Sequence, residues 1–205
     1  MDKPALVLAL LVFAAIGALP RIFFRRDGSL NLDWWLTALP FFAAPVLLVL
    51  SACHVFAAEE PRGWAGGLAI ASVVPFFLSG SLLFYTLGTH KVRIALWHQE
   101  NDAPVSIVTT GAYRLVRHPF YVSFLLGVLG TALLLPHWST ALILVYAVVR
   151  LNSTAAREER RLGQSRFGSE YRDYIAVTGR FVPRFGRPRV ASPVSSPSEP
   201  GSARV

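Results

Sequence analysis

Long uncharged stretches alternate with short charged segments along most of the chain. Four such stretches stand out, at residues 4–20, 34–58, 63–90 and 119–149. An α-helix rises about 1.5 Å per residue, so a hydrocarbon core of about 30 Å needs about 20 residues. The second and third stretches therefore each predict one transmembrane helix, and the first predicts a short one.

The fourth stretch is longer than one membrane-spanning helix, with 31 residues. Near its middle, the run Pro136-His137-Trp138 combines a helix breaker, a polar group and an aromatic residue typical of the membrane interface. This run predicts a tight helical hairpin. The second arm is expected to continue past Arg150, whose long side chain can reach the interface, to about Leu162. The pattern predicts an all-α, polytopic membrane helix bundle of about five transmembrane helices.

Composition supports a membrane as the solvent. Of the 205 residues, 53% are hydrophobic and only 16% are charged, which leaves few polar groups to cover a soluble domain. The net charge of +8 could indicate nucleic-acid binding. However, the basic residues lie between and after the apolar stretches and form no single basic stripe. We therefore expect membrane lipids, and no nucleic acid, as partners.

The positions of the basic residues predict the topology. Of the 20 Lys and Arg residues, 18 fall in alternate loops or after the last span, and only Lys3 and Arg62 lie elsewhere. Positive residues concentrate on the cytosolic side, so we expect a multi-pass protein with a cytosolic C-terminus. Cys53 is the single cysteine, and the chain has no C-x-x-C pair or H-E-x-x-H motif. No disulfide framework or metal site is expected.

The densest polar cluster lies where the chain re-enters the membrane after its third cytosolic loop. Residues 111–121 read G-A-Y-R-L-V-R-H-P-F-Y. Pro119 suits the first turn of a helix, where its missing N–H would have no partner in any case. Arg117 and His118 would then lie beside a helix N-terminus, which favours an anionic group such as a carboxylate or phosphate. The alternative is an interfacial pair that only anchors the helix.

Two further clusters follow the hairpin. Glu158 and Glu159 lie in the run R-E-E-R-R on the extension of the last helix. Adjacent residues are about 100° apart on a helix, so we expect only one carboxylate to face a pocket; both could instead belong to a solvated face. Residues 167–174 and 180–183 read F-G-S-E-Y-R-D-Y and R-F-V-P. They predict an amphipathic lid on the membrane surface, or alternatively a peripheral anchoring helix.

The expected organisation has three parts. Residues 1–103 are N-terminal transmembrane helices, and residues 104–186 hold the polar clusters, the hairpin and a C-terminal cap. Residues 187–205 are rich in Pro, Ser and Arg, which predicts a disordered tail.

The order and spacing of the three clusters resemble the isoprenylcysteine carboxyl methyltransferase family and its phospholipid methyltransferase relatives. The resemblance covers about residues 104–185. It implies a membrane methyltransferase in which the last helices and the cytosolic C-terminal segment bind S-adenosylmethionine. The methyl acceptor would be lipophilic or small, and a lipophilic one would enter from the bilayer. The soluble Rossmann-like methyltransferase fold is not expected, and the chain has no G-x-G-x-x-G turn after a strand.

The resemblance also assigns site residues. Those implied in cofactor binding are Arg117, His118, Tyr121, Glu158, Glu159, Tyr171 and Tyr174. Among them, Arg117, His118 and Glu159 are the catalytic candidates. The acceptor could be a carboxylate, an amine or a thiol, and only an amine or thiol would use His118 or a glutamate as a base. One departure from the family is Ser123, where many relatives have glycine.

Two other functions are consistent with parts of the pattern. The motif R-H-P-x-Y also occurs in membrane sterol reductases, which use NADPH, but Phe120 and Ser123 depart from their sequence and the Glu158–Glu159 pair favours the methyltransferase. The other function is that of a non-catalytic membrane scaffold. It would apply if each polar cluster only anchored its segment at the membrane surface or formed a solvated face.

Overall fold

The computed structural model describes residues 2–19, 23–25, 27–55, 63, 65–89 and 107–184. The predicted domain boundary between residues 103 and 104 and the predicted tail at 187–205 lie outside the described residues. The elements in chain order are α1 (Lys3–Gly17), α2 (Leu32–Ala52), α3 (Ala65–Ala71), α4 (Val73–Thr89), the 3-10 helix η1 (Gly111–Arg114), α5 (Pro119–Leu134), α6 (Trp138–Gly163) and α7 (Gly168–Val177). Within these ranges strand pairing is limited to two isolated β-bridges.

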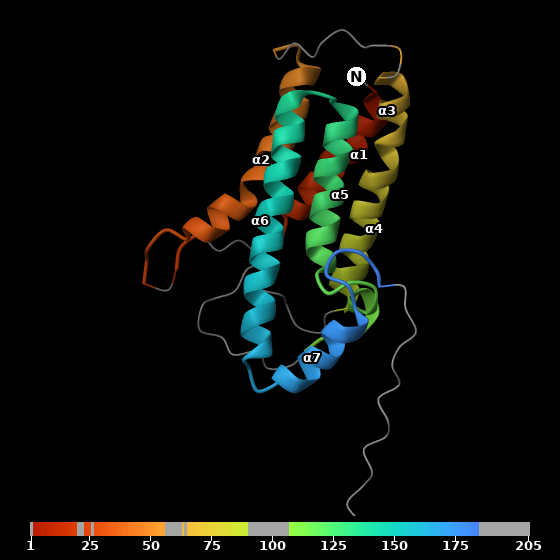
Figure 1. Cartoon of the computed structure of the whole chain (residues 1–205). Helices are drawn as coiled ribbons and strands as arrows, with labels where there is room; N and C mark the ends of the chain where they lie inside the picture. The colour runs from red at the N-terminus through yellow and green to blue at the C-terminus, as the bar shows by residue number, and fades with distance from the viewer. Residues whose placement is uncertain are drawn as a thin grey trace, which may run out of the picture.

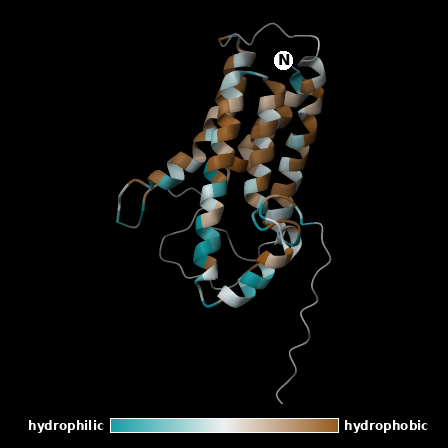
Figure 2. Ribbon diagram, in the orientation of Figure 1, coloured by the Kyte–Doolittle hydropathy of each residue, from teal (hydrophilic) through white to brown (hydrophobic). Residues whose placement is uncertain are grey.

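The helices form an elongated bundle that is apolar over most of its length (Figures 1 and 2). Three helices are long and apolar enough to cross a membrane, namely α2, the α3–α4 unit over Gly66–Thr89, and α6. The all-α, multi-pass prediction is confirmed. Helices α1 and α5 are apolar but have only 15 and 16 residues. Whether they complete five spans stays a prediction.

The predicted hairpin is confirmed. Helix α5 has Pro119 in its first turn and ends at Leu134, and α6 begins at Trp138. The ring of His137 caps α6, because its Nδ1 accepts a hydrogen bond from the Ser139 N–H at 3.2 Å. As expected, α6 continues well past Arg150 into the charged segment.

Helix α5 lies at the centre and contacts α1, α2, α3, α4 and α6. Its closest approach is to α4. A Cβ atom added at Gly130 would lie 2.8 Å from the ring of Phe76, which is fully buried. Further along the two helices, the hydroxyl of Ser79 on α4 donates a hydrogen bond to the carbonyl of Ser123 on α5 at 2.6 Å. Ser123 therefore lies in the α4–α5 packing, where small side chains let the two backbones approach.

The N-terminal half of α2 leans away from the bundle (Figure 1). Side chains of α6 contact it. Pro40 has no N–H, so the Leu36 carbonyl loses its helical donor. The Tyr146 hydroxyl supplies a donor to this carbonyl at 2.8 Å. Close by, Arg150 donates to the Asp33 carboxylate at 2.6 Å. Since an unpaired carbonyl is costly in a membrane, the contact with Tyr146 stabilises the proline-containing helix.

We expect Tyr146→Phe to lower the free energy of unfolding by about 1 kcal/mol, because the variant leaves the Leu36 carbonyl without a donor. Denaturation of the detergent-purified protein measures the effect. Ser153→Ala is the matched control, since that hydroxyl bonds to Val149 within α6, where the helix backbone already supplies a donor. Equal stabilities of the two variants would contradict the assignment.

Candidate functional site

Helix α6 is long enough for its charged end to extend beyond a hydrocarbon core. Glu159 lies about 32 Å along the helix from Trp138, which exceeds a hydrocarbon core of about 30 Å. Helix α7 crosses beneath this end of the bundle (Figure 1). The segment after α7 then returns to the start of α5, where the Arg117 N–H donates to the Gly179 carbonyl at 2.8 Å and the His118 N–H to the Arg180 carbonyl at 3.2 Å. Three segments distant in sequence thus meet at one place.

Glu159 is the centre of the charged cluster. Its Oε1 accepts from Arg117 Nε at 3.0 Å and lies 3.2 Å from His118 Nε2. Arg180 binds both oxygens, through Nε to Oε1 at 3.0 Å and Nη2 to Oε2 at 2.6 Å. Arg117 is fixed further by donating to the Thr178 carbonyl. The Glu159 carboxylate, with its side chain only 10% exposed, is thus matched by two guanidinium groups.

These contacts keep Glu159 ionised. Burial alone would raise its pKa, but the hydrogen bonds from His118, Arg180 and Arg117 outweigh burial and hold the pKa of Glu159 well below the ordinary carboxyl range. A carboxylate with such a low pKa is a poor proton acceptor at neutral pH. Glu159 can therefore act as a fixed negative charge rather than as a base.

Glu158 approaches the same histidine from another side. Tyr121 donates its hydroxyl to Glu158 Oε1 at 2.6 Å, and Glu158 Oε2 lies 3.5 Å from His118 Nδ1. The rings of His118 and Tyr121 stack with centroids 5.2 Å apart. Both carboxylates therefore contact one histidine, and the expectation that only one glutamate would face a pocket stays a prediction. Flexible side chains that start about 100° apart on α6 reach the two nitrogens of one imidazole ring.

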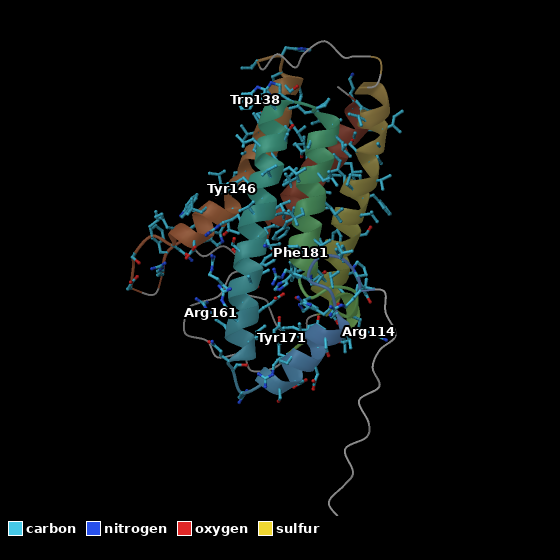
Figure 3. All side chains as sticks on the ribbon, in the orientation of Figure 1. Arg114, Trp138, Tyr146, Arg161, Tyr171 and Phe181 are labelled. Carbon is cyan, nitrogen blue, oxygen red and sulfur yellow. The ribbon has the colours of Figure 1, made fainter. Side chains whose placement is uncertain are left out.

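Helix α7 contributes a buried aromatic side to the cluster. Tyr171 and Tyr174 are both buried, with ring centroids 5.9 Å apart, and Tyr174 donates its hydroxyl to the Tyr113 carbonyl on η1 at 2.6 Å. Burial raises the pKa of Tyr174 to about 12 and also raises that of Tyr171. Both phenols are neutral at pH 7. Figure 3 shows Tyr171 and Phe181 at this end of the bundle, and the Phe181 ring lies 6.1 Å from that of His118.

The structure brings together all of the residues that the sequence suggested for one site. They are Arg117, His118, Tyr121, Glu158, Glu159, Tyr171 and Tyr174. Sequence reasoning noted the run R-F-V-P but did not single out Arg180, which makes the bidentate contact with Glu159. Charge balance could have identified Arg180 from the sequence, since a buried carboxylate needs cationic partners.

The fold and the site define the protein as a multi-pass membrane helix bundle. Its charged cluster, lined by aromatic residues, lies at one end of the bundle. Residues 65–170, more than half of the chain, match the phospholipid methyltransferase family. The chain belongs to this family, as the motif resemblance indicated.

Curated relatives give three different descriptions. A cobalt-zinc-cadmium resistance protein, CzcN, from Cupriavidus metallidurans is 35% identical over 51% of this chain and 51% of its own. A probable protein-S-isoprenylcysteine O-methyltransferase from Oryza sativa is 33% identical over 42% of each chain. A methanethiol S-methyltransferase from a Pseudomonas strain is 28% identical over 74% of this chain and 64% of its own. The chain thus spans about half the length of CzcN. No solved structure matches it.

Proposed function

We propose that this protein is a membrane methyltransferase that uses S-adenosylmethionine to methylate a lipophilic or small acceptor, either a carboxylate, an amine or a thiol. The observation that carries the proposal is the convergence of Arg117, His118 and both glutamates with the α7 tyrosines beyond one membrane face. Family membership supports it, as do relatives named as O- and S-methyltransferases. We also place the site on the cytosolic side, on the basis of the arginine distribution.

The donor set fits the chemical groups of this cofactor. Arg180 is 31% exposed at its side chain, so it can bind a carboxylate while still contacting Glu159. Glu158 keeps acceptor capacity on Oε2 for hydroxyl groups of a ribose, since its side chain is 19% exposed. The neutral rings of Tyr171 and Tyr174 can stabilise a sulfonium cation through their faces.

S-adenosylmethionine supplies an electrophilic methyl group. The protein's contribution is alignment of the acceptor and exclusion of water. For a carboxylate acceptor no proton needs to move. For a thiol or an amine the base would be His118 or Glu158, because the pKa of Glu159 is held too low for it to accept a proton at neutral pH. Arg117 serves as a positioning residue, linking Glu159 to the Thr178 carbonyl in the segment after α7.

Calorimetric titration of the detergent-purified protein with S-adenosylhomocysteine tests the proposal, with NADPH as the second titrant. We expect saturable binding of the first compound alone. Binding of NADPH alone would support the sterol reductase alternative, and binding of neither would support a non-catalytic scaffold; either result would overturn the proposal.

A matched pair of variants tests the location of the site. His118→Asn removes the ring between the two carboxylates but leaves a residue suited to start α5. We expect it to weaken S-adenosylhomocysteine binding by about 10-fold or more, which corresponds to the loss of about 1.4 kcal/mol. His54→Asn is the control, since His54 is exposed and follows the C-terminal end of α2. Equal affinities in the two variants would remove His118 from the site.

A further inference from the structure

A folded loop projects from the bundle before α2, far along the chain from the charged cluster (Figure 1). Residues 23–31, which we name the projecting ribbon, are described except for residue 26. Phe24 and Leu30 form an antiparallel β-bridge, and the Arg25 N–H donates to the Ser29 carbonyl at 2.8 Å. Gly28 turns the tip with φ at 80°, and Asn31 caps α2. The ribbon is therefore a defined turn with its own hydrogen bonds.

The base of the ribbon exposes large apolar side chains. Phe24 is 61% exposed, Leu30 50% and Leu32 51%. Phe23 stacks on Trp35 with centroids 5.3 Å apart, and Trp35 is itself 41% exposed. A contiguous apolar patch of this kind is unfavourable in water and indicates a partner.

This patch is continuous with the membrane-facing side of α2. The exposed residues Leu36, Leu39 and Phe42 follow it along the helix. The tip, by contrast, is polar, since Ser29 donates its hydroxyl to Asp27 at 2.6 Å. The ribbon thus changes from apolar at its base to polar at its tip.

The depth of the ribbon is set by α6. Asp33, two residues after the N-cap of α2, binds Arg150 on α6 at 2.6 Å. Figure 2 shows the ribbon at the level where α6 changes from hydrophobic to hydrophilic. This level lies near the edge of the hydrocarbon core, because aromatic residues concentrate there and the long side chain of Arg150 can reach the interface from within the core.

We propose that the projecting ribbon is an interfacial anchor that binds the phospholipid headgroup layer on the side of the bilayer where α7 lies. Phe24 and Leu30 lie below the phosphates, and the tip points to water. The basic residue Arg25 complements the charge of the phosphates. Continuity with the lipid-facing surface of α2 favours lipid over a second copy of the chain. The anchor holds the proline-containing arm of α2 at the interface, and it does not depend on the methyltransferase activity.

Site-specific fluorescence in phospholipid vesicles tests this placement. Cys53 is replaced by alanine, and an environment-sensitive dye is attached to cysteine in Phe24→Cys, Leu30→Cys or Ser29→Cys variants. Lipids spin-labelled near the headgroup should strongly quench the dye at positions 24 and 30, and aqueous iodide should quench it weakly. At position 29, on the tip, the order should be reversed.

Two positions at the base of the ribbon, 24 and 30, are labelled, so the test stays decisive if one of these variants fails to insert into the membrane. Iodide quenching as strong at positions 24 and 30 as at position 29 would overturn the proposal. Protection from both quenchers at positions 24 and 30 would also overturn it, because a protein surface would then cover the ribbon. Dilution of the protein in lipid distinguishes a second copy, since protection by self-association would fall with dilution.

Discussion

Replacing Gly179 by alanine is expected to weaken S-adenosylhomocysteine binding by about 10- to 100-fold, the equivalent of about 1–3 kcal/mol. An added Cβ atom would overlap the carbonyl of Val182, a backbone atom of the same turn. The turn after α7 would have to open. Arg180, which follows Gly179 directly, would then leave the Glu159 carboxylate.

The effect should be confined to the site, because the turn lies outside the membrane helices. Calorimetry measures the affinity, and circular dichroism checks that helix content is unchanged. Gly163→Ala is the matched control, since no atom lies within 4 Å of its added Cβ. Gly179→Ala protein that binds as tightly as the control would contradict this reading of the turn. If the unsubstituted protein does not bind the compound, a lower melting temperature for Gly179→Ala than for Gly163→Ala still tests the turn itself.

Replacing Glu159 by alanine should have the largest effect on stability, about 3 kcal/mol in the free energy of unfolding. The variant leaves Arg117, with its side chain only 9% exposed, and Arg180 without a carboxylate. The cost is the desolvation of buried positive charge that no longer has a partner. Denaturation in detergent measures the change.

Glu158→Ala is the matched control on the neighbouring position of α6. It loses a hydrogen bond from Tyr121, and its side chain is more exposed than that of Glu159, so we expect a cost of about 1 kcal/mol. Arg180→Ala combined with Glu159→Ala should recover part of the loss, because one of the unmatched charges is removed. Equal costs for the two single glutamate variants would show that the guanidinium contacts of Glu159 do not stabilise the fold.

The helical parts of the fold could be predicted from local pattern. Apolar run lengths predicted the membrane helices, and Pro136 with His137 predicted the break between α5 and α6. A short first helix was also predicted, and α1 has 15 residues. Local signals start both helices, since the side chain of Asp2 caps α1 and Pro119 lies in the first turn of α5.

Residue type and order in the chain also determined most of the site. The runs G-A-Y-R-L-V-R-H-P-F-Y and R-E-E-R-R identified the segments that meet, because charged residues next to membrane helices are few and costly. Which side chains of these segments contact one another was not determined in this way. That both glutamates reach His118 depends on the rotation of α6 against α5, and their starting angle of about 100° on the helix suggested otherwise.

By itself, the sequence determined the helix bundle and the hairpin, because hydropathy and proline act within a few residues of their own position, and the family resemblance suggested the residues of the polar cluster. Only the tertiary structure decided that Arg180 completes the charge balance at Glu159, that Tyr146 supplies a donor to the Leu36 carbonyl, and that Arg150 binds Asp33 beside the projecting ribbon. Each of these contacts joins segments distant in sequence. Such contacts depend on how whole helices pack, and local residue pattern carries no information about that packing.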